Sequence, residues 1–307
     1  MSLPSVTAII LNYRRPQATV ACLRSLKQTD YPQLNIVVID NDSRDSSVEF
    51  VQREHPDVSI IQAPRNAGYA GGMNIGIRRA LQNGSEFLFI ANSDTEVAPE
   101  TMLGLATALS DYPNAAAATG TIYYADRNTH RAWYAGGSIK YWRGSGFARH
   151  TLPDEDGERK RVVQTVTFVS GCAFLIRSAA LRVTGLFDER FFLYLEDTEL
   201  CSRLLRQHYQ LLYVPAAPIY HNVTENGMKP LILYFTVRNR LFFLRHCAHG
   251  FDRVAGFIYV LTTLVLKTGF WILARRDLLR PTVEGVKDFF LGIMYEGNGL
   301  KFRERQS

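Results

Sequence analysis

The sequence has little cysteine, and its cysteines are not arranged as a metal centre or a disulfide framework. The four cysteines, Cys22, Cys172, Cys201 and Cys247, lie far apart, and no C-x-x-C pair occurs. We therefore expect reduced thiols in a cytoplasmic protein and no zinc site. The first residues also lack a charged and then apolar signal segment, which predicts that the chain starts in the cytosol.

Signatures of nucleic-acid binding are also absent, although the chain carries a net charge of +6. No helix-turn-helix, zinc-finger or RNA-binding motif occurs, and there is no internal repeat or low-complexity tract. The charge is uneven. From Lys229 onward, thirteen basic and six acidic residues give +7, which leaves −1 of the total +6 for the rest of the chain. A basic tail of this kind favours an anionic membrane surface over nucleic acid as a partner.

What the sequence does contain is enough apolar material for a packed core. With 307 residues, 47% of them hydrophobic, we expect one large domain or one domain with an appendage. Strand and helix patterns alternate in the first half. We predict strands over residues 6–11, 35–39, 58–61 and 87–91, and helices over residues 16–28, 47–54, 74–82 and 99–110. Apolar strands separated by helices form parallel βαβ units, which predicts an α/β fold with a mostly parallel central sheet flanked by helices.

Polar side chains directly follow three of these strands. Asn12 follows the first, D-N-D-S at residues 40–43 follows the second, and N-S-D-T-E at residues 92–96 follows the fourth. Open α/β sheets bind ligands at the carboxyl ends of their strands, so these clusters predict a nucleotide site. Mg²⁺ or Mn²⁺ usually takes one or two carboxylates together with phosphate oxygens, a role that suits Asp94. Alternatively, each cluster is a turn whose side chains satisfy local backbone groups.

A second acidic cluster follows an aromatic-rich segment. Glu196, Asp197 and Glu199 open a helix predicted to run to residue 205, immediately after F-F-L-Y-L at residues 191–195. Acidic residues in a first turn oppose the helix macrodipole, so a purely structural role stays open. The other interpretation is a general base in an apolar cleft, whose walls would raise the pKa of a carboxyl toward a useful range.

Three further patterns are less specific. A strand predicted over residues 166–176 carries Gly171 at its middle, where a ligand or a backbone can approach closely. His221 follows a predicted strand over residues 211–214 and a Pro-rich turn, so a contact with metal or phosphate and a structural role both fit it. R-N-R at residues 238–240 lies on a predicted amphipathic helix, as a phosphate-binding group or as a solvated face.

In this order, the segments resemble the inverting glycosyltransferases of family 2, which have the GT-A fold, and most of all their bacterial rhamnosyltransferase-like branch. The resemblance runs from residue 6 to residue 239. Each segment alone is weak, but the ordered set is highly specific. The segments are I-I-L-N-Y at 9–13, V-V-I-D-N-D-S-R-D at 37–45, N-A-G-Y-A-G-G-M-N-I-G at 66–76, N-S-D-T-E at 92–96, S-G-C-A-F-L-I-R at 170–177 and F-D-E-R-F-F-L-Y-L-E-D-T-E-L at 187–200.

The resemblance implies roles for individual residues. A nucleotide-diphosphate sugar would be the donor and Mg²⁺ or Mn²⁺ the cofactor, held by Asp94 with His221. Asp197 would be the catalytic base, supported by Glu196. The family's usual Asp-x-Asp appears here as N-S-D at residues 92–94, with an amide in place of one carboxylate. The donor side would comprise Asn12, Asp40, Asn41, Asn66, Gly68, Asn74, Asn92 and Ser93, with a loop over residues 66–74 wrapping the donor. The acceptor side would comprise Gly171, Cys172, Glu199 and Arg238.

By the same resemblance, the reaction would transfer L-rhamnose from dTDP-rhamnose to a glycan or a polyprenyl-linked acceptor in bacterial surface polysaccharide synthesis. Two other functions stay open. A nucleotidyltransferase normally has a Gly-rich, basic phosphate loop after its first strand, whereas N-Y-R-R-P at residues 12–16 lacks glycine. A catalytically inactive scaffold that binds sugar nucleotides is disfavoured by the presence of both Asp94 and Asp197.

The tail over residues 229–307 is predicted to be a helical extension of a catalytic domain over residues 1–228. Residues 254–274 are mostly apolar and long enough to span a bilayer, but Lys267 lies inside the stretch and basic residues flank both of its ends. A charge near the middle of a span costs about 2.5–3.5 kcal/mol. We therefore expect a helix in the membrane interface and a peripheral enzyme on the cytoplasmic face of the inner membrane. The alternative is a packed helical pair of a soluble enzyme, or an oligomer interface.

Overall fold

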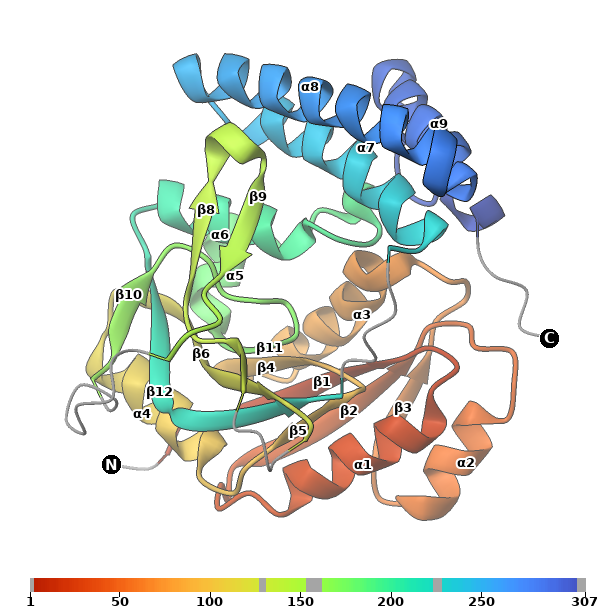
Figure 1. The fold of residues 1–307 in the computed structure, drawn as a ribbon. Coiled ribbons are helices and arrows are strands. Elements are labelled where there is room, and N and C mark those ends of the chain that lie inside the picture. Colours follow the sequence, from red (N-terminus) through yellow and green to blue (C-terminus); the bar gives the residue numbers. More distant parts are fainter. Residues whose placement is uncertain (1–2, 127–130, 153–161, 223–227, 303–307) are drawn as a thin grey trace.

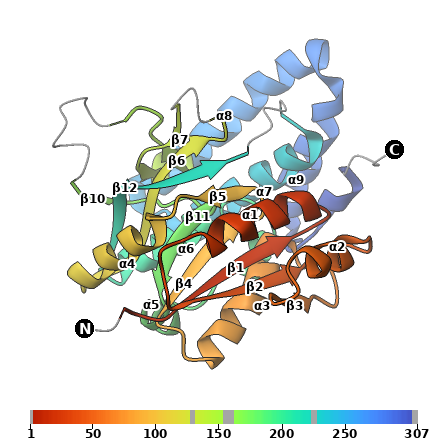
Figure 2. The same ribbon diagram turned by 90° about the horizontal axis from the view of Figure 1, so that it is seen from below.

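The computed structural model describes residues 3–126, 131–152, 162–222 and 228–302. Within these ranges, helices cover both faces of one central sheet, and the C-terminal helices form a group at one side of it (Figure 1). Seen from below, α1 (Pro16–Lys27) lies on one face of the sheet and α3 (Gly68–Gln82) on the other (Figure 2). The predicted α/β class with a C-terminal helical extension is confirmed.

Eight strands of the described chain form the main path of the sheet, in the order β10-β12-β6-β11-β4-β1-β2-β3. They are β1 Val6–Asn12, β2 Leu34–Asp40, β3 Ser59–Gln62, β4 Phe87–Asn92, β6 Ala115–Tyr124, β10 Gln164–Val166, β11 Ala173–Arg177 and β12 Gln210–His221. Strand β11 is antiparallel to both β4 and β6, and β12 is parallel to β6, so β6 and β12 run in the same direction as β4. Because β1, β2 and β3 also run with β4, the strands of this main path that oppose the common direction are β10 and β11.

Shorter elements complete the fold. Strand β5 (Thr95–Val97) pairs with β12, β7 (Ala132–Tyr134) pairs with β6, and β8 (Gly137–Lys140) forms a separate hairpin with β9 (Ser145–Ala148). The other α-helices of the described chain are α2 Ser47–Glu54, α4 Thr101–Asp111, α5 Ser178–Thr184, α6 Glu196–Arg206, α7 Pro230–Cys247, α8 Gly250–Ala274 and α9 Leu279–Leu291. Short 3₁₀ turns lie at η1 Tyr141–Arg143, η3 Glu189–Phe191, η4 Arg276–Leu278 and η5 Gly299–Phe302.

The segment predicted as a donor-wrapping loop over residues 66–74 is instead largely the first two turns of α3. Its glycines allow the helix to lie directly on the sheet. A Cβ built at Gly72 would lie 2.6 Å from Leu11 Cδ1, and one at Gly76 would overlap Ile9 Cγ2. Gly72 and Gly76 are therefore needed for close packing between the helix and the strands.

Two predicted strands also differ from the structure. The strand predicted over residues 166–176 is two strands, β10 and β11, and Gly171 lies in the turn before β11. The strand predicted over residues 211–214 continues as β12 to His221, through the prolines that were taken for a turn. Its pairing with β6 shifts register between Val214 and Pro218, which is where a strand tolerates proline.

Helix α7 belongs to the protein interior. Leu241, Phe243 and Leu244 are fully buried and belong to the same hydrophobic core as the sheet strands. Of the two alternatives left open for R-N-R at residues 238–240, the solvated face does not hold for Arg238 and Asn239, which have no exposed surface.

Helix α8 is different. It is long and apolar enough to cross a membrane by length and composition, with a mean hydropathy of 1.7 over a window that is only 11% buried. Its inner side packs on α7 and η1, and its outer side faces solvent (Figure 1). The acidic and basic residues crowded into 154–161 predict an exposed loop, and this segment lies outside the described residues.

Candidate active site

A cavity of about 300 Å³ lies at the carboxyl ends of β1, β2 and β4, where the strand-end clusters were predicted to meet. One wall is polar, and the opposite wall is apolar and includes residues of α7 and η5. The lining residues are Leu11, Tyr13, Arg15, Asn41, Asn66, Gly68, Tyr69, Asn92, Ser93, Asp94, Phe192, Leu193, Leu231, Phe235 and Leu300. A second cavity, of about 620 Å³, opens at the other ends of the strands beside Ser5 and Leu34. It contains none of the predicted site residues.

Asn12 and Asp40 lie beneath the cavity and hold two strand ends together. Asn12 Nδ2 donates to Asp40 Oδ1 at 2.8 Å, and Ser43 Oγ donates to the same oxygen at 2.6 Å. The other oxygen of Asp40 accepts from the backbone amide of Ser43 at 3.1 Å. Both predicted donor residues are almost fully buried, so here they fix the shape of the floor and do not line the cavity.

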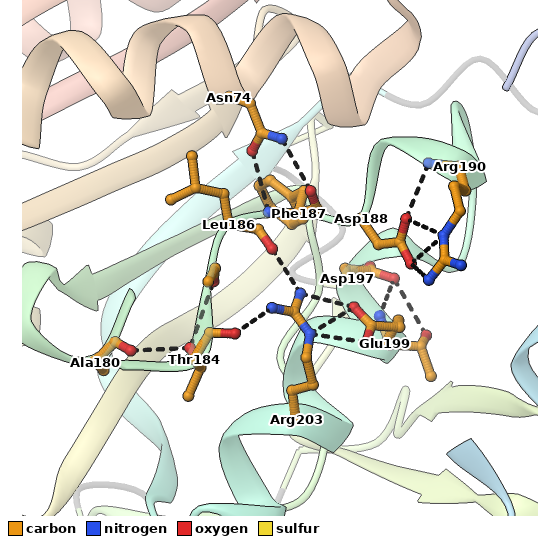
Figure 3. Close-up of polar contacts among 12 residues, drawn as sticks. Asn74, Ala180, Thr184, Leu186, Phe187, Asp188, Arg190, Asp197, Glu199 and Arg203 are labelled. Carbon is orange, nitrogen blue, oxygen red and sulfur yellow. Dashed lines mark hydrogen bonds and ion pairs between the residues drawn. The ribbon is translucent and has the colours of Figure 1, made fainter. Parts of the chain in front are cut away.

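Asn41 and Asn66 reach the cavity itself. Asn41 Nδ2 donates to Asn66 Oδ1 and to the carbonyl of Gly68, at 3.1 and 3.0 Å, and Asn41 Oδ1 accepts from the amide of Ala67. The end of β2 thereby holds the turn that enters α3. Asn74 lies further along α3 and does not line the cavity. Its side chain bonds both the amide and the carbonyl of Phe187, as Figure 3 shows.

Asp94 lies between two basic side chains. Its Oδ1 is 3.1 Å from His221 Nε2, and its Oδ2 accepts from Arg15 Nη1 at 2.7 Å. Burial raises the pKa of Asp94, but the hydrogen bond and charge of His221, with the charge of Arg15, outweigh it and hold the pKa below the ordinary value. Burial lowers the pKa of His221, but the sulfur of Cys172 and the carboxylate of Asp94 raise it to about 10. The site is thus organised around negative charge at Asp94.

The residues present fit a divalent cation only if a ligand completes its shell. Among the described residues there is no group of three or more Cys, His, Asp or Glu side chains that could hold a metal. Asp94 and His221 face each other within hydrogen-bonding distance, so the pair would supply two protein ligands once a cation displaces the proton of His221. Mg²⁺ in such sites takes its other ligands from phosphate oxygens and water, as the diphosphate of a nucleotide would provide.

Asp197 and Glu196 begin α6 on the other side of a two-residue turn. Asp197 Oδ2 accepts from the amide of Gly171 at 2.8 Å, and its Oδ1 accepts from the amide of Thr198 at 2.6 Å. The same turn reaches the Asp94 cluster, because the carbonyl of Cys172 accepts from the amide of Asn92 at 2.9 Å. The turn therefore joins the two acidic clusters that the sequence shows 100 residues apart.

Burial raises the pKa of both carboxyls. It raises the pKa of Asp197, and the hydrogen bonds from Gly171 and Thr198 only partly offset it. Burial and the neighbouring charge of Asp197 raise the pKa of Glu196 well above its ordinary value. Glu196 is 6% exposed, and its Oε2 has no hydrogen-bond partner within the described ranges. Burial and the unpartnered oxygen therefore both disfavour a charge on Glu196 beside the base candidate.

Two residues predicted on the acceptor side are held by the protein itself. Both carboxylate oxygens of Glu199 bond to Arg203, which also donates to the carbonyls of Thr184 and Leu186 (Figure 3). Arg238 is buried under η3 with its guanidinium on backbone carbonyls. Neither side chain lines the cavity.

The sequence reasoning missed Arg15, Tyr69 and the C-terminal wall. Arg15 precedes the proline that opens α1, so only its place after β1 hinted at the site. Tyr69 lines the cavity and donates to the carbonyl of Gly171 at 2.5 Å, a contact between segments 102 residues apart. Phe235 and Leu300 lie beyond every motif, so no local pattern pointed to them.

Comparison with known proteins agrees with this fold. The model of the family described as "Glycosyl transferase family 2" matches residues 7–184, more than half of the chain. The mannosyltransferase PcManGT of Pyrobaculum calidifontis, solved with GDP-Man and Mn²⁺, superposes with a TM-score of 0.60 over 95% of this chain and 88% of that one, at 14% identity. That likeness shows the fold, and the predicted GT-A type is confirmed.

Two relatives extend the match in sequence. The chain is 25% identical over 229 residues to the N-acetylglucosaminyl-diphospho-decaprenol L-rhamnosyltransferase of Mycobacterium tuberculosis, covering 68% of this chain and 73% of that protein. It is 25% identical over 252 residues to the dTDP-rhamnosyl transferase RfbF of Shigella flexneri, covering 78% and 80%. These matches support a glycosyltransferase and not the alternative of a nucleotidyltransferase. The chain belongs to glycosyl transferase family 2.

Proposed function

We propose that this glycosyltransferase moves L-rhamnose from dTDP-rhamnose to a hydroxyl of a lipid-linked glycan, with inversion at the anomeric carbon. The observation that carries the mechanism is the turn at residues 171–172. Its Gly171 amide binds Asp197, and its Cys172 carbonyl binds the end of β4 two residues from Asp94. The turn thereby links the proposed base, which is not among the residues lining the cavity, to the proposed diphosphate anchor, which is.

Asp197 is the proposed base. It accepts the proton of the acceptor hydroxyl as that oxygen attacks the anomeric carbon and the bond to the diphosphate breaks. Burial and the charge of Asp197 raise the pKa of Glu196, which disfavours a second negative charge beside the base. Asp94 and His221 would hold a divalent cation, which when bound neutralises charge on the departing nucleoside diphosphate. Arg15 lies beside the same position, with 56% of its side chain exposed.

The donor is placed over the polar wall. Asn41, Asn66 and Gly68 present amide and backbone groups to the cavity, and Asn92 and Ser93 extend this surface to Asp94. The names of the two relatives support deoxythymidine diphosphate rhamnose as the first donor to test. The protein resembles those relatives at 25% identity, so the sugar itself is part of the proposal.

The acceptor is placed against the apolar wall. Phe192, Leu193, Leu231, Phe235 and Leu300 form an aromatic and aliphatic surface on the side of the cavity where the C-terminal helices lie. Such a wall suits an acceptor that carries a polyprenyl chain. We propose that the enzyme works peripherally at the cytoplasmic face of a membrane, with the outer side of α8 in the lipid interface.

A panel of sugar nucleotides tests this function. The full chain is incubated with dTDP-rhamnose and with UDP- and GDP-linked sugars, with and without Mg²⁺ or Mn²⁺, and released nucleoside diphosphate is measured. We expect cation-dependent turnover that is highest with dTDP-rhamnose. Asp94→Ala should abolish the effect of the cation on donor binding. Donor binding without turnover of any sugar nucleotide would instead support the inactive scaffold.

A further inference from the structure

The segment that leads into the proposed base has a backbone that bulky residues rarely adopt. In this segment, residues 191–195, which we call the base loop, Phe192, Tyr194 and Leu195 have φ angles of 63°, 70° and 67°. Positive φ at large side chains is an outlier and persists only where the surrounding structure imposes it. The next two residues are Glu196 and Asp197, so the base loop sets where α6 begins and where its first carboxyls point.

One side-chain amide group of α7 contacts three backbone carbonyls of this loop. Asn239 Nδ2 lies 2.8 Å from each of three backbone carbonyl oxygens, those of Phe191, Leu193 and Tyr194. The group has two hydrogens, which the three acceptors share. The carbonyl of Phe191 also accepts from the amide of Leu193 at 2.7 Å, so it keeps a partner if the amide of Asn239 is removed. Leu193 and Tyr194 lie outside any helix or strand, so their carbonyls depend on Asn239.

Arg238 fixes the amide. Its Nε donates to Asn239 Oδ1 at 3.0 Å, which leaves Nδ2 to face the loop. Its Nη2 donates to the carbonyl of Phe191 at 3.0 Å, and its Nη1 donates to that of Tyr295 at 2.7 Å. Both side chains are fully buried, so the guanidinium is committed to these contacts and cannot reach a phosphate in the cavity.

The opposite side of the base loop touches the donor wall. The carbonyl of Phe192 accepts from the amides of Tyr69 and Ala70, at 2.7 and 3.2 Å, at the start of α3. The ring of Phe192 stacks on Phe235 of α7 with centroids 5.2 Å apart, and both rings line the cavity. The loop is therefore clamped between the helix that carries the donor turn and the first C-terminal helix.

We propose that Arg238 and Asn239 are positioning residues for transfer, which act by holding the base loop in its strained form so that Asp197 faces the acceptor. This proposal rests on the proposed role of Asp197 as base. It gives α7 a function in catalysis without any contact between Arg238 or Asn239 and substrate. A misplacement of about 1 Å at a reacting group can cost about 100-fold in rate.

The test replaces the amide by a side chain of similar size that cannot donate. Asn239→Leu should raise hydrogen–deuterium exchange of the base-loop amides by about tenfold or more and lower kcat by about 100-fold, with the KM for the sugar nucleotide within about threefold. Arg240→Met is the matched control. Arg240 lies on the same helix and donates to the carbonyl of Arg143, away from the base loop. The base-loop amide exchange and the kcat of Arg240→Met should match those of wild type.

A second variant covers the case in which Asn239→Leu does not fold. Arg238→Lys keeps the buried charge but cannot span both Asn239 and the loop carbonyls, so it should show the same exchange and kcat changes to a smaller degree. Loop exchange and kcat equal to those of Arg240→Met in a folded variant would overturn the proposal. A rise in KM with unchanged kcat would also overturn it.

The exchange measurement needs no substrate, so it separates the two proposals. If Asn239→Leu loosens the loop while Asp197→Asn keeps full turnover, the base assignment fails and the clamp stands as a structural device only.

Discussion

At the scale of single residues, the three acids in the first turn of α6 have three different surroundings. Asp197 accepts from the amide of Gly171, in a turn from another part of the chain, and from that of the adjacent Thr198. Glu199 bonds to Arg203, and the Oε2 of Glu196 has no hydrogen-bond partner in the described part of the chain. If the three acids served only to oppose the helix macrodipole, we would expect the same surroundings for all of them. The sequence could place them at a helix start but could not separate them, because their partners are 26 residues upstream for Asp197 and four residues downstream for Glu199.

Replacing the proposed base should stop transfer without unfolding the protein. For Asp197→Asn we expect kcat to fall by roughly 10²- to 10⁴-fold, because a positioned general base contributes about that much. Affinity for the sugar nucleotide, measured by calorimetry, should stay within a few-fold of wild type. Near-normal turnover by this variant would remove Asp197 from its role.

The pH dependence of stability should report on Glu196. Its pKa is raised in the folded protein, so the folded form binds more protons than the unfolded chain, and the free energy of unfolding should fall as pH rises above about 4.3. Glu196→Gln removes this loss. Between pH 4 and pH 8, the variant should therefore lose less stability than wild type. Chemical unfolding at the two pH values measures the difference, and equal slopes for both proteins would contradict it.

At the scale of elements, the sequence predicted what local pattern controls. The four leading strands and their polar ends lie where expected, because apolar runs and the residues after them are set by burial of the strand. The start of α3, the separation of β10 from β11 and the length of β12 depend on neighbours distant in sequence. Gly72, for instance, lies in the segment expected to be a loop, and it packs in a helix with Leu11 beneath it.

A pair of glycine substitutions tests this packing. A Cβ at Gly76 would overlap Ile9, a fully buried and stiff β-branched residue, so Gly76→Ala should destabilise the protein by about 1–3 kcal/mol. Gly104→Ala is the control in α4, where the nearest atom to a built Cβ is 3.8 Å away. It should be neutral or stabilise by up to about 1 kcal/mol, since alanine favours a helix. Urea unfolding of both variants decides.

At the scale of the whole molecule, the outer side of α8 stands apart. Along one face, Phe251, Val254, Ile258, Val265 and Leu273 are each at least 60% exposed, with no charged residue between them on that face. A continuous exposed apolar face of this kind usually marks a surface that binds a protein partner or a membrane. Basic side chains lie at its ends, at Arg253 and at Arg275 and Arg276, which favours anionic lipid.

A charge on this face should release the enzyme from membranes. Burying a valine side chain in an apolar phase stabilises by about 1.5–3 kcal/mol, so Val265→Glu should weaken binding to anionic liposomes by about tenfold or more in a sedimentation assay. Val183→Glu is the matched control, because Val183 is 65% exposed on α5, away from the face. Equal binding by both variants would remove the membrane proposal, and a changed oligomeric state of Val265→Glu without liposomes would point to a second copy instead.

Helix α7 finally bears on how the chain can be divided. The match to the family model ends at residue 184, before the proposed base, and α7 closes the cavity with Phe235 while Asn239 grips the base loop. A fragment ending near residue 222 would therefore contain every strand of the described sheet but lack one wall of the cavity, the core residues of α7 and the contacts of Asn239. Supplied as a separate polypeptide, residues 228–307 should restore turnover to that fragment. The two pieces would behave as halves of one enzyme that reassemble through α7.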